Sequence, residues 1–428
     1  MFLLIAPFQL HNFNKRSFLQ KTHHVMTSPS FGASYNFDEL SEIIKDGNSK
    51  KIETVKNLGL VNSELKTLLH VSAQEKQKEI SKYLLEKGLN PDQKDAKGKS
   101  AFAYACLTED ENLINLFLEY KPNVNTQDNL GNTPAHKAIK NMQVLKILLD
   151  NGANPYVQNE FGLPLLHMAK NNLETADFLL KRKINPNSIN EDGQSLLHTA
   201  ASEGRIELIK KLISYNAEVN FKDNENNTPL FFAKNPFVIQ ELVDNGSKVN
   251  ITNKKGETPL GLFFKRKNKD NIEALLKNGA NSNEKYKNEK PFLYYCDQPE
   301  LAELFLGHGA NPNDDFYLHY ALMMKKDDLF DLFLKYGADS NKKAENGRTP
   351  LFYCTSTEQI KKLLDAKSEI NVKDDNENTP WHNFMLIGRK DLADFLVEQG
   401  ADISLKNRNG ETPSDYYEKW KKYNFWIK

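Results

Sequence analysis

A short pattern of residues recurs along most of this chain. A Thr, often followed by Pro, stands before an apolar residue and in several copies before a His, as in Thr133-Pro134-Ala135-His136. Related starts follow one another about 33 residues apart. They lie at Thr67, Ser100, Thr133, Pro164, Ser195, Thr228, Thr258, Lys290, Phe316, Thr349, Thr379 and Thr412. A unit this short cannot bury an apolar face alone, so the period predicts stacked repeats rather than separate globular domains.

Each unit has the features of a helix pair. Thr supplies a capping hydroxyl, and Pro at the first helical position removes an N–H that has no partner there. A second apolar stripe follows at helical spacing, as in residues 206–213, and ends at Gly-Ala, as in Gly279-Ala280. The polar, glycine-marked stretch before the next start, such as residues 128–131, suits a turn. The sequence therefore predicts an all-α solenoid of stacked helix pairs with short β-hairpin or turn tips.

This pattern resembles the ankyrin-repeat family, whose repeats have a period of 33 residues and a Thr-Pro-Leu-His signature. The resemblance extends over roughly residues 38–428. It implies an N-terminal cap at 38–61, about eleven repeats at 62–411 and a C-terminal cap at 412–428. Its strongest matches start at Thr133, Ser195, Thr228, Thr258, Thr349, Thr379 and Thr412.

The chain departs from the family pattern at three places. Lys121-Pro122 replaces Gly-Ala, and Lys290-Pro291 replaces Thr-Pro. Only 26 residues separate Lys290 from Phe316, and the tip glycine is missing there. We therefore expect a trimmed loop around residues 314–319.

Residues 1–37 precede the repeats and allow more than one interpretation. They begin with the apolar stretch MFLLIAPFQL, and the first acidic side chain is that of Asp38. A disordered tail, or a mis-assigned start with Met26 as the alternative, is the favoured interpretation. An organelle-targeting segment is the other interpretation, supported by Lys15, Arg16 and Lys21 in an acid-free stretch.

Composition excludes several classes of function. The 57 Lys+Arg residues balance 57 Asp+Glu residues, so no overall positive field attracts nucleic acid or anionic lipid. No apolar run approaches the roughly 20 residues needed to cross a bilayer. The three cysteines are far apart and form no CxxC pair, which favours a reducing compartment. We expect a cytoplasmic monomer that binds neither nucleic acid nor membrane, with secretion into a host cytoplasm as the alternative.

Histidine and cysteine recur at fixed positions of the repeat. The family resemblance implies that the histidines bond between neighbouring loops, and one His per repeat cannot converge on a metal ion. The cysteines stand where the pattern has Ala and should act as small buried apolar residues. No phosphate-binding glycine loop and no HExxH motif occurs, so we expect no enzyme activity, cofactor or metal. The residues concerned are His70, His136, His167, His198, His319 and His382, with Cys106, Cys296 and Cys354.

Recognition of a protein partner is the remaining function. The resemblance implies that partners bind the loop tips and the adjoining first helices, which form a concave face. Apolar residues replace the usual polar ones at three tips and at two first-helix ends, and a basic run ends another first helix. An acidic partner is one explanation of the basic run, and a solvated lysine-rich surface is the other. The candidates are Leu130, Phe161, Tyr286, Met323, Met324, Leu386 and Ile387, with Lys265, Arg266 and Lys267.

Local burial of the apolar candidates inside irregular repeats is the alternative to partner binding. We interpret the chain as a non-catalytic scaffold or adaptor for protein–protein interaction. The alternative function is a targeting arm, in a microbial effector or a ubiquitin-ligase adaptor, that recruits an enzyme in trans.

Overall fold

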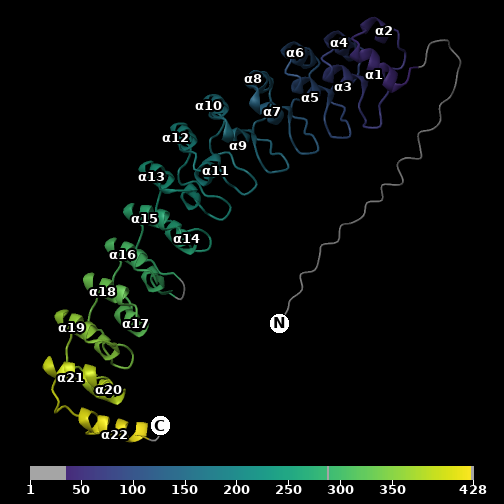
Figure 1. Cartoon of the computed structure of the whole chain (residues 1–428). Helices are drawn as coiled ribbons and strands as arrows, with labels where there is room; N and C mark the ends of the chain where they lie inside the picture. Colours follow the sequence, from purple (N-terminus) through teal and green to yellow (C-terminus); the bar gives the residue numbers. More distant parts are fainter. Residues whose placement is uncertain (1–34, 287–288, 426–428) are drawn as a thin grey trace. The chain divides into compact units, whose positions relative to one another are not determined.

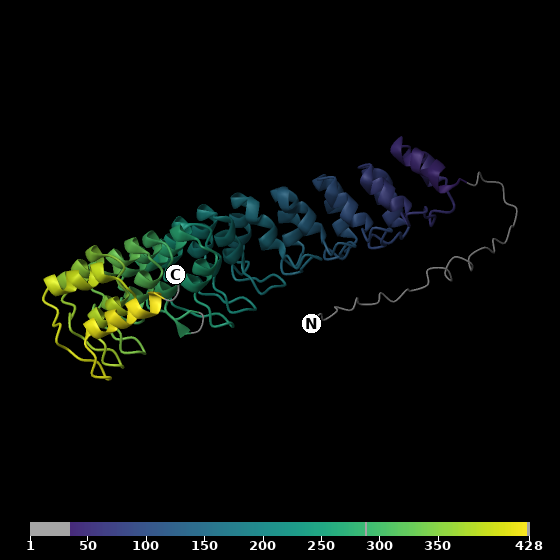
Figure 2. The ribbon, with the colours of Figure 1, turned by 60° about the horizontal axis from the view of Figure 1, so that its bottom comes forward.

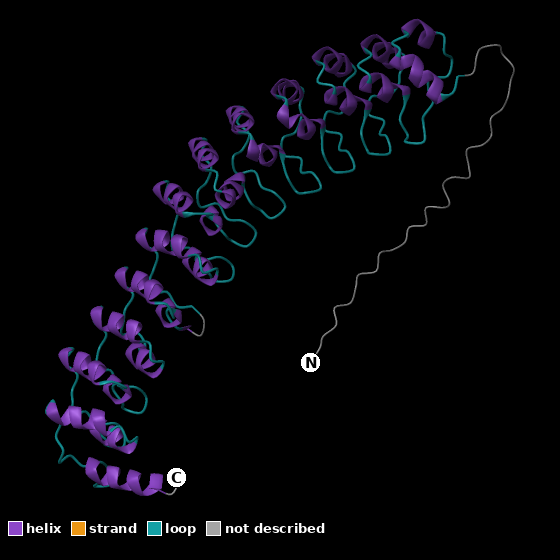
Figure 3. Ribbon diagram, in the orientation of Figure 1, coloured by secondary structure: helices purple, strands orange, loops and turns teal. Residues whose placement is uncertain are grey.

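The computed structural model describes residues 35–286 and 289–425, and the chain divides into two compact units, Met1–Pro122 and Asn123–Lys428. Residues 1–34, which make up most of the predicted tail, lie outside the described residues. In each unit, pairs of short helices follow one another in chain order (Figure 1). The described residues contain helices and turns but no strand, so both units are all-α stacks and the predicted fold class is confirmed (Figure 3).

The first unit contains three helix pairs. The side chain of Asn36 caps the first helix by accepting from the Glu39 N–H, and the Glu39 side chain accepts from the Asn36 N–H in return. Segment 38–61 thus forms a helix pair, while its role as a cap stays a prediction. The helices are α1 (Phe37–Lys45), α2 (Ser49–Glu53), α3 (Leu68–Gln74), α4 (Lys78–Glu86), α5 (Ala101–Leu107) and α6 (Glu111–Glu119).

The second unit continues the same order with first helices of unequal length. The first helices are α7 (Pro134–Lys137) with η1 (Ala138–Lys140), α9 (Leu165–Met168) with η2 (Ala169–Asn171), α11 (Leu196–Glu203), η3 (Pro229–Phe232), α14 (Pro259–Lys265), η5 (Phe292–Tyr295), α17 (Tyr317–Met323), η6 (Pro350–Tyr353), α20 (Pro380–Leu386) and α22 (Pro413–Phe425). The second helices are α8 (Met142–Asp150), α10 (Leu173–Lys181), α12 (Ile206–Ser214), α13 (Pro236–Asp244), α15 (Lys269–Lys277), α16 (Pro299–Gly307), α18 (Asp327–Lys335), α19 (Thr357–Asp365) and α21 (Lys390–Glu398).

Within each unit the first and second helices form two layers with the apolar core between them. In α12, for example, Leu208, Ile209 and Leu212 are buried, and the contacting helix α11 buries Leu196 and Leu197. The loops project beyond the first-helix layer along one edge (Figure 2). We call the surface made by the loops and the first helices the loop face.

The loops are stacked turns rather than two-stranded hairpins. In the described chain, β-type pairing between the two sides of a loop is limited to isolated antiparallel bridges, for example Ile189 with Ser195. The predicted trimmed loop is confirmed, because residues 308–316 alone connect α16 to α17, whereas residues 278–291 connect α15 to η5.

The start of one repeat differs by one residue from the sequence pattern. Pro291, and not Lys290, bridges to Lys285 and precedes the first residue of η5, as Ser100 bridges to Lys94 and precedes α5. Pro291 therefore occupies the position of the capping Thr, and this helix lacks a hydroxyl cap.

Gly131 is essential to the packing of its loop against the next one. Its φ angle is +69°, and an added Cβ would lie 2.7 Å from the Glu160 backbone nitrogen and 2.9 Å from the Asn159 Cα. Both the left-handed conformation and the close approach to the neighbouring backbone therefore require glycine.

We predict that Gly131→Ala lowers the free energy of unfolding by about 2–4 kcal/mol, because left-handed strain and the backbone clash add. Gly152→Ala is the matched control, since φ is +88° there but no described atom lies within 4 Å of the added Cβ. Urea denaturation of both variants measures the difference. Equal losses in the two variants would show that the close approach at Gly131 does not matter.

Candidate partner-binding surface

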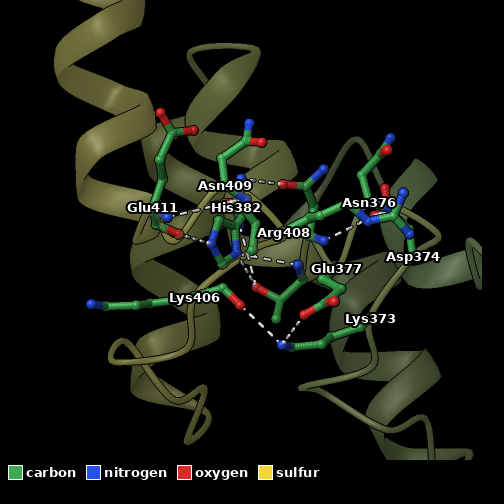
Figure 4. Close-up of polar contacts among 12 residues, drawn as sticks. Lys373, Asp374, Asn376, Glu377, His382, Lys406, Arg408, Asn409 and Glu411 are labelled. Atoms are coloured by element: carbon green, nitrogen blue, oxygen red, sulfur yellow. Dashed lines mark hydrogen bonds and ion pairs between the residues drawn. The ribbon is translucent and has the colours of Figure 1, made fainter.

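Six histidines join successive loops. In each, Nε2 donates a hydrogen bond of 2.9–3.2 Å to a backbone carbonyl of the following repeat, as His382 does to Glu411 (Figure 4). In four of them Nδ1 accepts the N–H of the residue before the helix, at 3.0–3.2 Å. Both ring nitrogens of these four are thus used by the backbone. The predicted bonds between loops are present at His70, His136, His167, His198, His319 and His382.

Burial keeps these imidazoles neutral. It lowers the pKa of all six, and that of His167 falls to about 4. In the described part of the chain no group of three His, Cys, Asp or Glu residues is arranged to hold a metal ion. The histidines therefore act as structural links in this arrangement.

The three cysteine thiols are also withdrawn from solvent. Cys106, Cys296 and Cys354 are buried, and burial raises the pKa of each thiol. A nucleophilic cysteine needs the opposite environment, with a lowered pKa and an accessible sulfur. The interpretation of these residues as small buried apolar groups agrees with their environment.

A second ladder, made of asparagines, joins the repeats and was not recognised in the sequence. Asn250 is typical, because its Nδ2 donates to the Gly279 carbonyl at 3.0 Å while its Oδ1 accepts the Asn281 N–H at 3.0 Å. Each member stands three residues after the Gly-Ala position, so a recurring Asn there was the available signal. The six residues that make both bonds are Asn125, Asn220, Asn250, Asn283, Asn313 and Asn341.

The loop tips are also linked to one another by backbone bonds. The Glu160 N–H donates to the Leu130 carbonyl at 3.0 Å, and the Arg408 N–H donates to the Asn376 carbonyl at 3.1 Å (Figure 4). The side chain of Lys373 adds a bond of 2.9 Å to the Lys406 carbonyl of the next repeat. The loop face is therefore held in place before any partner arrives.

Six of the seven apolar candidates are exposed on this face. Leu130 and Phe161, 46% and 65% exposed, lie on two tips that share a backbone bond. The side chains at the first-helix ends are 45–61% exposed: Met323 and Met324 end α17, and Leu386 and Ile387 end α20. Local burial does not account for these six residues.

Tyr286 is different, and its placement corrects the expectation of an exposed tip. Its ring packs 5.4–5.6 Å from the rings of Phe264, Phe292 and Tyr295, and the residue is only half-buried by this cluster. It extends the core of its repeat rather than presenting a separate contact.

Unequal first-helix lengths explain why the ends of α17 and α20 project. Each of these helices has seven residues, whereas η5 and η6 beside them have four. The last turn of α17 and of α20 therefore has no matching turn in the repeat between them. The signal was present in the 30-residue interval from Thr349 to Thr379, which is about one turn shorter than the usual period.

The basic candidates end α14, another seven-residue helix. Lys265 pairs with Glu257 at 3.5 Å, and the Arg266 guanidinium lies over the Phe263 ring at 5.9 Å. Lys267 lines a cavity of about 540 Å³ with Phe264 and Tyr295. These charges are thus partly satisfied within their own repeat, and the η5 repeat separates them from Met323.

A further cavity of about 530 Å³ opens beside the trimmed loop, and it was not predicted from the sequence. We call it the notch. Rings from three successive repeats line it together with Met323. They belong to Tyr294, Phe316, Tyr320 and Tyr353.

Comparison with known proteins identifies the family. A family model of ankyrin repeats (three copies) matches overlapping segments that run from residue 36 to residue 374. The chain belongs to the ankyrin-repeat family. Ankyrin repeats are protein–protein interaction modules, and no helix of the described ankyrin-repeat chain has the length and apolarity needed to span a membrane.

Its relatives are similar over part of their length. A putative ankyrin repeat protein of Acanthamoeba polyphaga mimivirus is 26% identical over 238 residues, which are 49% of this chain and 31% of that protein. A putative palmitoyltransferase of Danio rerio is 24% identical over 225 residues, which are 50% of this chain and 31% of that protein. The chain thus spans less than a third of either relative. The ankyrin repeat domain of Bcl-3 has a TM-score of 0.45 at 24% identity and covers 48% of this chain and 97% of that domain.

We predict that acid destabilises this ankyrin-repeat protein below pH 6.5. An unfolded His has a pKa of about 6.5, and the buried ones have lower values, so the unfolded chain binds more protons between these limits. The contribution of the neutral histidines to the free energy of unfolding is fully present above pH 6.5, and it is lost as the pH falls from there toward the pKa values of the folded protein. His167, with its pKa of about 4, contributes about 2 kcal/mol of this loss at pH 5.

Urea midpoints at pH 7.5 and pH 5 measure this effect. The control is His167→Gln, which should be less stable at pH 7.5 but should lose less on going to pH 5. An equal acid loss in the two proteins would contradict the assignment to this histidine.

Pro164 leaves one ladder histidine incompletely bonded. Proline has no N–H, and within the described residues His167 Nδ1 is buried without a hydrogen-bond partner. We predict that Pro164→Thr raises the free energy of unfolding by about 1 kcal/mol, because the new N–H and hydroxyl outweigh the greater freedom of the unfolded chain. Pro164→Ala, which restores the N–H alone, should gain less. A Thr variant no more stable than the Ala variant at pH 7.5 would count against a capping role.

Proposed function

We propose that this protein is a non-catalytic interaction module that binds a protein partner on its loop face, the concave side of an ankyrin array. The observation that carries this proposal is the set of six exposed apolar side chains at two loop tips and two first-helix ends. Large apolar and methionine side chains are frequent anchors of protein interfaces. Here they stand on the face where a repeat usually exposes polar groups.

The links between repeats support binding as well as stability. Histidine, asparagine and backbone bonds hold successive loops in one arrangement, for example His136 to Leu163 and Asn125 to Gly152. A surface ordered in advance loses little conformational entropy when a partner binds. The exposed anchors are therefore presented at low entropic cost.

An affinity capture from native lysate tests the proposal. Met323→Glu/Met324→Glu and Leu130→Glu/Phe161→Glu introduce charge at two separate places on the candidate face, and at least one pair should abolish capture of a partner that wild type retains. The control is Phe237→Glu at the start of α13, in the second-helix layer, where the side chain is 76% exposed. It should leave capture unchanged.

Circular dichroism establishes that each variant keeps its helix content. If both double variants stay folded and retain every partner, the loop face is not the binding surface. If Phe237→Glu alone loses the partner, binding belongs to the second-helix layer instead.

A further inference from the structure

The notch arises because one loop is trimmed. Residues 308–316 are too few to form a full tip, so the sides of the two neighbouring repeats stay uncovered. Tyr294 stands on η5, Tyr320 and Met323 on α17, and Tyr353 on η6, and all four line the cavity. The loop face therefore has a pocket, and an exposed anchor residue lies at its edge.

The lining of the notch includes buried apolar groups and one hydroxyl without a hydrogen-bond partner in the described chain, beside the buried Asp315 and His319. Cys296 and Phe333 are buried there, and the Tyr317 ring stacks on Phe333 with 5.3 Å between centroids. Tyr317 is 3% exposed, and its Oη has no hydrogen-bond partner among the described residues. An apolar side chain is the group that such a lining accepts with least desolvation cost.

Three lysine ammonium groups lie beside rings of the notch, and one of them, Lys290, also lines the cavity. They lie 5.1–5.6 Å from the centroids of its rings: Lys290 at Tyr294, Lys326 at Tyr320 and Lys342 at Phe316. Each of these three rings therefore has a cation beside it.

Only one of these lysines has an acidic partner. Lys290 pairs with Asp315 at 2.6 Å. Lys326 donates to the Asp297 carbonyl at 3.4 Å, and Lys342 donates to the Asn313 and Asp315 carbonyls. In the described chain neither Lys326 nor Lys342 pairs with a carboxylate, so carboxylates of a partner would complement them.

We propose that the notch binds an apolar side chain from an extended acidic peptide segment of a protein partner, with flanking carboxylates against Lys326 and Lys342. The inference rests on the proposed function and names the partner chemistry for one part of the loop face. The Tyr353 hydroxyl accepts a hydrogen bond from Asn346 Nδ2 at 3.2 Å. Its own hydrogen is therefore available to donate to a backbone carbonyl of the bound peptide.

A peptide fits this site better than a single-stranded nucleic acid. Stacking of successive bases needs a row of open rings along a positive groove. Here the rings enclose one pocket, and Glu345 places a carboxylate in its lining. The chain as a whole carries no net charge.

Fluorescence polarisation with short labelled peptides tests the proposal on the full chain. The probe is a heptapeptide with a central Leu between acidic residues, and the comparison peptides have a central Ala or lysine flanks. The acidic Leu peptide should bind at least about tenfold more tightly than either, and added salt should weaken it, since exposed charges are screened.

Variants of the protein locate the binding. Ala344→Phe fills the notch and should weaken binding of the acidic Leu peptide at least tenfold. Met323→Ser removes part of the apolar lining and should weaken peptide binding about threefold or more. The Met323 side chain is 61% exposed, so its replacement should not impair folding. Lys326→Gln/Lys342→Gln should reduce both affinity and salt dependence, whereas Lys254→Gln/Lys255→Gln, at another exposed tip, should change neither.

Three results would overturn the proposal: equal binding of the Leu and Ala peptides, wild-type binding by both Ala344→Phe and Met323→Ser, or displacement of the probe by oligouridine at lower concentrations than by unlabelled peptide. The last would identify a nucleic-acid site. If these tests fail while Leu130→Glu/Phe161→Glu loses its captured partner, the interaction function stands without the notch. If the peptide binds as expected but both double variants still capture every partner from lysate, the proposed function fails and the peptide site remains.

Discussion

The structure depends on one constraint: a pair of helices of four to nine residues cannot bury its apolar side on its own. Isolated helices of this length are unstable in water. Each buried Leu or Ile, such as Leu208 and Ile209 of α12, contributes roughly 1.5–3 kcal/mol only when neighbours cover it. Every repeat is therefore completed by the repeats on either side.

The polar groups of the loops also depend on the neighbouring repeats. The loops expose backbone N–H and carbonyl groups that no strand pairs in the described residues, and side chains of the adjoining repeat satisfy many of them. His382 bonds to Glu411, and Asn250 bonds to Gly279 and to Asn281. The polar residues that recur are thus committed to structure, which is why candidates for binding lie where the repeat is irregular.

Irregular repeats create surface because their neighbours remain regular. The short first helices η5 and η6 leave the last turn of α17 uncovered and expose Met323 and Met324. The short loop at residues 308–316 leaves the rings of the adjacent repeats around a cavity. Both features require a missing segment in one repeat and a complete segment in the next.

The family resemblance implied the structural role of the histidines. The sequence alone was sufficient for the helix pairs, the stacking period and the trimmed loop. Each of these follows from local signals, such as Thr133-Pro134 at a helix start or the 26-residue interval before Phe316. The sequence could single out the apolar candidates, because an apolar residue at a usually polar position is visible in a repeat, but it left local burial open, and the structure exposes six of the seven.

Only the tertiary structure decided what depends on the neighbouring repeat. Tyr286 stands at a loop tip in the sequence, yet it packs against Phe264 and Phe292, which lie in two different repeats. Pro291 proved to hold the capping position because its bridge to Lys285 sets the register of the loop. The notch and its three lysines combine residues from positions 290 to 353. Local pattern specifies each helix and turn, whereas exposure is set by the length and side chains of a repeat about 30 residues away, which packing brings alongside.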